Sequence, residues 1–213
     1  MTGLVFRPAA ASDVDAAVPL IHSSGPAAFE YVFGVPAVGD AQAFLRHAFV
    51  HGDGEFGWRN HVVGELDGVV VATGAGYGGA TKWPFTLAAA RQILKHYGWR
   101  QAAGVIARGL RVESVIPPPA GRMYYLGHLG VSPAWRGRGF GAALVAHLLS
   151  LRPADADDPA TLDVATTNAA AQRLYQRLGF EVVGERRSRL ANGQGRVPDH
   201  RRMQRWSGRE GVR

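Results

Sequence analysis

Cysteine is absent from the 213 residues of the sequence. This absence excludes a disulfide framework, a cysteine-ligated metal site and a cysteine nucleophile, and it fits a reducing compartment. No apolar stretch approaches the roughly 20 residues that a membrane-spanning helix needs. Residues 1–10 also lack the basic and apolar regions of a signal peptide. We therefore expect a cytoplasmic protein with no membrane partner.

Lysine is scarce: of the 24 basic residues, only Lys82 and Lys95 are not arginine. The formal net charge is +7, and much of the excess lies from Arg186 to Arg213. A basic surface is compatible with nucleic acid, an anionic membrane or a polyanionic ligand. Binding of single-stranded nucleic acid would favour aromatic residues between the basic ones, and the only aromatic residue after Arg186 is Trp206. Nucleic-acid binding through this arginine-rich tail is therefore a minor alternative.

The chain is long enough to bury one substantial core, and we see neither a repeat nor a linker. We expect a single domain over residues 1–206 and a frayed basic C-terminus at 207–213. Hydrophobic periodicity and turn signals predict an α/β fold. The expected strands lie at 4–7, 61–65, 69–75, 123–131, 161–165 and 180–184, with a last strand within 196–206. The expected helices lie at 14–21, 40–50, 84–112 (broken at Gly98), 141–151 and 168–178.

A glycine-rich loop joins the strand at 123–131 to the helix that follows it. The run reads Leu129-Gly130-Val131-Ser132-Pro133-Ala134-Trp135-Arg136-Gly137-Arg138-Gly139-Phe140-Gly141. Glycine lets backbone N–H groups approach a ligand closely, and a helix N-terminus adds unpaired donors and the positive end of a dipole. Arg136 and Arg138 add positive charge at the same place. Together these features indicate a site for a phosphate or pyrophosphate.

Two other interpretations of the loop stay open on its residues alone. The first is a turn that only tightens a strand–helix junction. The second is a dinucleotide fingerprint, which Gly137-x-Gly139-x-x-Ala142 satisfies formally. That fingerprint requires the glycines to follow the first strand directly. Here residues 132–136 intervene, and Asp163, at the spacing of the ribose-binding acid, falls inside an expected strand.

A second motif begins at Asn168. Its residues read Asn168-Ala169-Ala170-Ala171-Gln172-Arg173-Leu174-Tyr175-Gln176-Arg177-Leu178-Gly179-Phe180. Asn168 is a good helix N-cap and Gly179 a good helix terminator. Asn168 and Tyr175 lie two helical turns apart and so share one face. Tyr175 is a candidate functional residue, although a core tyrosine is the usual occupant of such a position.

Both motifs, in this order, resemble the two signatures of the GCN5-related N-acetyltransferase (GNAT) family. The first resemblance is carried by Val131, Pro133, Arg136, Gly139 and Gly141. The resemblance is strong over 123–184 and rests on element order before that. It implies a mixed, mostly antiparallel sheet of about seven strands with flanking helices, splayed between the fourth and fifth strands. Against the family pattern, the chain carries a helical insertion at about 82–119.

The resemblance implies an acyltransferase enzyme that moves an acetyl group from acetyl-CoA to a primary amine of a small molecule or a protein, without a metal. The amine would attack the thioester directly, and backbone N–H near Val131 would polarise the thioester carbonyl. Tyr175 would protonate the departing thiolate. A CoA-binding sensor of the same fold without turnover is the alternative. The implied cofactor-binding residues are Leu129, Gly130, Val131, Arg136, Gly137, Arg138, Gly139, Phe140, Gly141, Asn168 and Tyr175.

The general base stays open. Many relatives carry a carboxylate or histidine on the strand before the glycine loop, and this chain carries His128 there, a residue type with a suitable ordinary pKa. Strict alternation puts Tyr125 and Leu129 on one face and His128 on the other, unless a bulge intervenes. A purely structural His128, or deprotonation through ordered water, are the alternatives.

The acceptor is expected to bind at the loop after the first helix, from His22 to Phe33. Within it, Glu30 is a candidate to steer a cationic amine, and Tyr31 and Phe33 are candidates for apolar walls. Tyr125 is a further substrate-binding candidate. Alternatively, this loop only packs over the core.

The insertion at about 82–119 brings several aromatic residues whose role the sequence leaves open. They would either roof the acceptor pocket or form the contact of a homodimer if exposed. These residues are Trp83, Phe85, Tyr97 and Trp99.

Overall fold

The computed structural model describes residues 3–153, 156 and 159–206. Its main sheet has seven strands in the order β1-β2-β3-β4-β5-β9-β6. Neighbouring strands are antiparallel except β4 and β5, which are parallel. The expected mixed, mostly antiparallel sheet is therefore confirmed. The strands are β1 Val5–Pro8, β2 His61–Leu66, β3 Val69–Gly78, β4 Tyr124–Val131, β5 Ala160–Ala165, β6 Glu181–Arg186 and β9 His200–Arg205, with a small separate hairpin of β7 Ala191–Asn192 and β8 Gly195–Arg196.

Six α-helices flank the sheet within the described residues. They are α1 Val14–Ser23, α2 Pro26–Phe33, α3 Ala41–His51, α4 Lys82–Val112, α5 Phe140–Ser150 and α6 Ala169–Arg177. The expected loop between His22 and Phe33 is wrong, because Pro26 occupies the first helical turn of α2. Proline favours that position, since its fixed φ suits a helix start and its missing N–H has no partner there anyway. The other expected helices are confirmed within a few residues.

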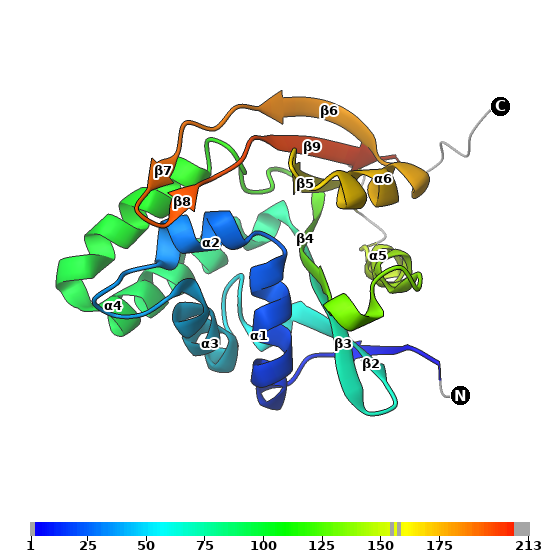
Figure 1. Cartoon of the computed structure of the whole chain (residues 1–213), viewed down its shortest axis with the longest axis horizontal. Coiled ribbons are helices and arrows are strands. Elements are labelled where there is room, and N and C mark those ends of the chain that lie inside the picture. Colours follow the sequence, from blue (N-terminus) through cyan, green and yellow to red (C-terminus); the bar gives the residue numbers. More distant parts are fainter. Residues whose placement is uncertain (1–2, 154–155, 157–158, 207–213) are drawn as a thin grey trace.

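The two faces of the sheet carry separate cores. Helices α1 to α4 lie on one side of β3 and β4, whereas α5 and α6 lie on the other (Figure 1). The first core gathers around Phe44 and Phe49, and the second around Leu144, Leu148 and Phe180. Burial of these large apolar side chains, each worth roughly 1.5–3 kcal/mol, holds the helices to the sheet.

The local turn signals of the sequence act as expected. Asp67 and Gly68 both adopt left-handed φ values, of 49° and 80°, at the tip of the β2–β3 hairpin. Such values are those of the tight two-residue turn that Asp-Gly favours. Asp40 caps α3 by accepting a hydrogen bond from the N–H of Ala43 at 2.9 Å. Gly52 ends the same helix with a left-handed φ of 81°.

Strands β4 and β5 part soon after they begin. Their pairing in the described residues consists of Tyr124 with Ala160 and Tyr125 with Thr161. Beyond Tyr125 the remainder of β4 pairs with β3 alone, and the remainder of β5 with β9 alone. The expected splay between the fourth and fifth strands is therefore present. Helix α5 follows the free end of β4, and α6 follows the free end of β5 (Figure 1).

The insertion forms α4, which is kinked at Gly98 with a left-handed φ of 67°. The end of its first half is tied to α2 by Tyr97, whose hydroxyl donates to the carbonyl of Phe33 at 2.6 Å. Trp83 and Trp99 are 76% and 75% exposed. They do not cover the sheet, and the insertion reaches it through Phe85, whose ring packs on Tyr77.

Among the described residues, no helix has both the length and the apolar character that crossing a membrane requires. The C-terminus expected to fray, 207–213, lies outside the described residues.

Candidate functional site

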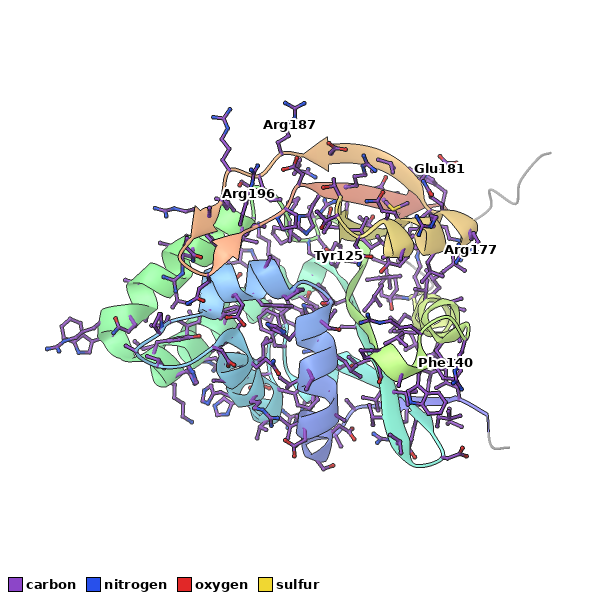
Figure 2. The ribbon with its side chains drawn as sticks, viewed as in Figure 1. Tyr125, Phe140, Arg177, Glu181, Arg187 and Arg196 are labelled. Atoms are coloured by element: carbon purple, nitrogen blue, oxygen red, sulfur yellow. The ribbon has the colours of Figure 1, made fainter. Side chains whose placement is uncertain are left out.

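The glycine loop between β4 and α5 is open toward its ligand side. Gly137 and Gly139 have left-handed φ values of 76° and 84°, and no atom lies within 4 Å of where either would carry a side chain. Gly139 is the N-cap of α5, and Phe140 begins the helix (Figure 2). The first N–H groups of α5 have no partner within the helix. The loop therefore presents free donors that fit an anion such as a pyrophosphate.

Arg136 and Arg138 are both exposed at this loop. Arg136 Nε donates to the carbonyl of Val131 at 3.1 Å, which anchors it to the end of β4. The Arg138 guanidinium lies 4.7 Å from the ring centroid of Trp135. Both cations thus lie beside the loop, where they would add to the attraction of the helix N-terminus for an anion.

Gly130 serves the fold as well as the predicted site. A Cβ on Gly130 would lie 2.3 Å from the carbonyl oxygen of Leu20 in α1. No side chain fits there, so β4 and α1 approach each other backbone to backbone. This contact places the Leu129–Val131 segment, predicted to bind the pantetheine arm, against α1.

Tyr175 lies on α6 and Asn168 is the N-cap of that helix, across the splay from α5. Asn168 Oδ1 accepts the N–H of Ala171 at 3.1 Å, so its role as N-cap is confirmed. Tyr175 is 8% exposed within the core of α5 and α6. Burial raises its pKa to about 12. Its hydroxyl makes no hydrogen bond to a described residue and stays protonated at neutral pH, as a proton donor must.

His128 forms a β-bulge with a left-handed φ of 56°. Pairing of β3 with β4 jumps from Ala75–Gly127 to Thr73–Gly130, so two residues of β4 lie opposite Gly74. Strict alternation, expected unless a bulge intervenes, therefore does not hold here, because the bulge inserts an extra residue into β4. Leu129 packs toward α5, and His128 instead faces Phe56 on the side of α1 to α3, which is also the side of Tyr125.

A chain of polar contacts runs through His128. His61 Nδ1 lies 2.9 Å from the Gly57 carbonyl, and His61 Nε2 lies 3.1 Å from His128 Nδ1. On the far side of the ring, His128 Nε2 lies 3.4 Å from Glu55 Oε1. The hydroxyl of Tyr77 donates to the same oxygen at 2.9 Å. These contacts connect His61, at the buried start of β2, to the carboxylate of Glu55 near the surface.

Two groups in this series of polar contacts have shifted pKa values. Burial, and next the charge of His128, lower the pKa of His61 to about 3. For Glu55, burial alone would raise the pKa, but hydrogen bonds with His128 and Tyr77 outweigh it and lower the pKa. At neutral pH His61 is therefore neutral and Glu55 is a carboxylate.

Tyr125 belongs to a second polar group, at the end of β4 that pairs with β5 (Figure 2). Its hydroxyl donates to Asp163 Oδ2 at 3.1 Å. Arg202 binds the same carboxylate through Nη2 to Oδ2 at 2.7 Å and Nε to Oδ1 at 3.1 Å. Burial, and then the charge of Asp163, raise the pKa of Tyr125. The mostly antiparallel sheet and this bidentate pair exclude the dinucleotide interpretation, because Asp163 is engaged by Arg202.

The residues predicted to bind the acceptor lie mainly in the core. Tyr31 and Phe33 are buried, and Phe33 stacks on Phe44 at 4.3 Å. Glu30 uses both oxygens, with Oε1 2.9 Å from His22 Nε2 and Oε2 accepting the N–H of Ala41 at 3.2 Å.

In α2 it is Phe29, not one of the predicted residues, whose ring lies beside His128, with 6.1 Å between centroids. A cavity of about 380 Å³ lies between the Gly52–Asn60 segment and the start of α4.

Glu55, His61 and Tyr77 were missed by reasoning from sequence. Glu55 follows a Gly-Asp-Gly turn, where an acidic residue is ordinary, and His61 opens a strand of apolar residues. The contacts of His61 and Glu55 with His128 involve the bulged residue, and the sequence carries no recognised signal for that bulge. Among the described residues, no group of three or more His, Asp or Glu side chains is arranged to hold a metal ion.

Comparison with known proteins gives a family match over most of the chain. Residues 38–180 match the model of the Acetyltransferase (GNAT) family. A curated relative, N-alpha-acetyltransferase RimI of Mycobacterium tuberculosis (strain ATCC 25618 / H37Rv), is 41% identical over 64 residues. That stretch spans 30% of this chain and 39% of the relative's length.

Solved structures share the fold over nearly the whole chain. An N-acetyltransferase from Staphylococcus aureus Mu50 has a TM-score of 0.64 at 17% identity, covering 94% of this chain and 99% of its own. The yncA protein of Salmonella typhimurium, solved with its cofactor acetyl-CoA, has a TM-score of 0.54 at 18% identity, covering 100% of this chain and 98% of its own. At sequence identities this low, the similarity shows a shared fold and nothing more specific.

Proposed function

The chain belongs to the acetyltransferase (GNAT) family, and on that premise we propose that it transfers an acetyl group from acetyl-CoA to a primary amine. The observation that carries the proposal is the splay of β4 and β5, with an open glycine loop at the end of β4 and Tyr175 on the helix after β5. A pantetheine arm would lie along the free edge of β4. Its pyrophosphate would bind the N–H groups from Arg136 to Gly141.

In the reaction, the nitrogen of the neutral amine forms a bond to the thioester carbonyl carbon and the C–S bond breaks. Backbone N–H near Val131 would stabilise the oxyanion that develops on the carbonyl. Tyr175 would give its proton to the departing thiolate, and burial supports this role because it keeps the hydroxyl protonated. His128 would take the proton that the amine loses.

For the acceptor, we propose the α-amino group of a protein or peptide as the first class to test. The support is the RimI relative, whose name describes an N-alpha-acetyltransferase. Glu55 is 39% exposed, so a carboxylate is available to a cationic acceptor on the side of His128.

Two alternatives remain to be separated. A CoA sensor of the same fold would bind acetyl-CoA and release no CoA with any amine. Nucleic-acid binding finds less support, because two arginines of β9 are engaged within the fold. Arg201 pairs with Glu185, and Arg202 with Asp163. Arg187 does point away from the body of the protein (Figure 2), and a steep salt dependence of binding to nonspecific DNA would revive this alternative.

The test is release of the CoA thiol from acetyl-CoA, measured with a panel of peptides that have free N-termini and a panel of small amines. Steady turnover with one class, and loss of most of it in Tyr175→Phe, would support the proposal. Binding of acetyl-CoA with no release across both panels would favour the sensor.

A further inference from the structure

The first half of α4 carries an apolar stripe on its outward face. The helix forms an outer edge of the molecule beside α2 and α3 (Figure 1). Four exposed apolar residues follow one another along it at steps of four, three and four residues: Trp83, Leu87, Ala90 and Leu94. At 3.6 residues per turn, these four fall within about 60° of the helix circumference. The opposite side of the helix is the one that packs on the core, where Gln92 is buried.

The charges beside this stripe are all positive. Arg91 and Lys95 lie along one flank of it, both exposed, and α4 contains no acidic residue from Lys82 to Val112. The nearest carboxylate to Arg91 is that of Asp53, at 3.8 Å, and Arg59 binds the same carboxylate at 3.2 Å. One anion is thus shared by two arginines. The outward face is therefore apolar along its middle and cationic at its edge.

The cavity of about 380 Å³ opens beside the same stretch of helix. Leu87 of the stripe and Arg91 of the flank both line it. A side chain that packs on Leu87 can therefore also enter a hollow that has a cation in its wall. The other lining residues come from the first turns of α4 and from the segment that ends at β2: Pro84, Phe85, Ala88, Gly52, Asp53, Gly54, Arg59 and Asn60.

The charges argue against a second copy of the chain as the occupant of this face. Trp83 and Trp99 are exposed, which was the condition for a homodimer contact through the insertion. Two copies packed stripe to stripe, however, would set the cations of one α4 beside those of the other. Since α4 has no acidic residue to balance them, like charges at the flanking positions would oppose the pairing.

The width of the stripe argues against a bilayer. A helix that lies in the membrane interface presents a broad apolar face, with its polar face turned to water. In α4 the side opposite the stripe is occupied by the core of the protein. A narrow stripe at alternating steps of three and four residues is instead the seam at which two helices pair.

We propose that the first half of α4 binds an acidic amphipathic helix of a partner protein. The apolar residues of the partner pack on the stripe, and one of its side chains enters the cavity beside Leu87. Its carboxylates bind Arg91 and Lys95. Apolar burial supplies most of the affinity, and the charges at the flank select the partner. Such docking is independent of acetyl transfer.

The test uses two designed peptides of about 21 residues, long enough to form a helix on binding. Both carry leucine at the a and d positions, and one carries glutamate and the other lysine at e and g. Like charges at these positions keep each peptide from pairing with itself. Fluorescence anisotropy of the labelled peptides measures their binding to the full-length protein. We expect saturable binding of the acidic peptide, and binding of the basic peptide at least about tenfold weaker.

Two leucines of α4 with equal exposure provide matched variants. Leu87 is 63% exposed and lines the cavity, whereas Leu110, 62% exposed, lies in the second half of the helix and does not line it. Both Leu87→Ser and Leu110→Ser should fold as wild type does. We expect Leu87→Ser to weaken binding of the acidic peptide about tenfold or more, as loss of a central apolar contact does. Leu110→Ser should bind as wild type, and an equal loss in both variants would contradict the placement.

A second pair of variants tests the charges. In Arg91→Gln/Lys95→Gln the preference for the acidic peptide over the basic one should largely disappear, because the cations of the flank are gone. Arg111→Gln removes an exposed cation from the second half of α4 and should leave the preference unchanged. A preference that survives the double variant would mean that these two cations do not select the partner.

The other occupants have their own outcomes. Cosedimentation is measured with vesicles of phosphatidylcholine and phosphatidylglycerol, and self-association by sedimentation velocity at rising protein concentration. Binding to vesicles, or a dimer, that is lost in Leu87→Ser while the acidic peptide does not bind would assign the face to a bilayer or to a second copy. Folded protein that binds neither peptide would likewise overturn the proposal, whether or not it transfers an acetyl group.

Discussion

His61 Nε2 lies 3.1 Å from His128 Nδ1 although the two residues belong to strands separated by β3. Ala75 of β3 pairs with both His61 and Gly127, and it is fully buried between them. Its methyl group leaves room for the two rings to meet above it. The bulge at His128 turns that ring toward His61, so that the two rings meet across β3.

Tyr175→Phe tests the proton donor. The substitution removes only the hydroxyl, which makes no hydrogen bond to a described residue, so the fold and acetyl-CoA binding should be retained. We expect kcat to fall by about one to two orders of magnitude, because the thiolate would leave without a proton. Steady-state kinetics and calorimetric titration of acetyl-CoA measure the two quantities. An unchanged kcat would remove Tyr175 from this role.

Gly139→Ala tests the glycine loop. The left-handed φ of 84° at Gly139 would cost an alanine about 1–2 kcal/mol, and the added methyl would stand on the open ligand side. We expect KM for acetyl-CoA to rise about tenfold or more, since 1.4 kcal/mol corresponds to a factor of ten. Gly184→Ala is the control, because that glycine also has open space but no left-handed φ. Equal KM values in the two variants would argue against the loop as the pyrophosphate site.

The pair of Asp163 and Arg202 should contribute to stability far more than a surface pair. Their side chains are 1% and 11% exposed. Removing one partner of a buried pair typically costs about 3–5 kcal/mol, so Asp163→Asn should lower the free energy of unfolding by about that amount. Glu185→Gln, which breaks the exposed pair with Arg201, should cost less than about 1 kcal/mol. Urea unfolding compares the two, and similar losses would contradict the prediction.

Acid should destabilise the fold through His47 and His96, which face each other between α3 and α4. Burial lowers the pKa of both, and for His47 the charges of His96, His51 and Lys95 lower it further. In the unfolded chain these histidines bind protons near pH 6.5, whereas the folded protein resists protonation. The free energy of unfolding should therefore fall as pH drops from about 7.5 to 5.5.

The double variant His47→Gln/His96→Gln isolates this effect. It should flatten the pH dependence in part, leaving the contributions of His61 and His200, whose pKa values are also lowered mainly by burial. Urea unfolding at several pH values measures it. A slope identical to that of wild type would mean that the two histidines do not contribute.

The sequence was a good guide where structure depends on local patterns. Asp67-Gly68, Asp40 and the glycines of the loop each specify a turn or cap within a few residues, and the fold follows from them and from the family resemblance. The bulge at His128 was left open by the sequence, because it arises from the register that β4 adopts against β3. For the same reason Glu55 and His61, 67 residues or more from their partner in the sequence, had no pattern in common with it.

The prediction of a loop at the acceptor side was wrong for a related reason. A run between two expected helices suggested a loop at His22–Phe33, but the apolar residues there are those of a short buried helix. Tyr31 and Phe33 therefore serve the core, and Phe29 is the residue of that helix that packs on His128. Periodicity over eight residues does not distinguish a buried helix from a loop that packs on a core.

The central claim is that the splay and the glycine loop bind an acyl-CoA. Calorimetric titration of acetyl-CoA into the purified protein, with NAD as the competing control, tests it most directly. We predict saturable binding of acetyl-CoA, no binding of NAD, and weaker binding of acetyl-CoA to Gly139→Ala. Folded protein that takes up no acetyl-CoA would contradict both the proposed enzyme and the CoA sensor.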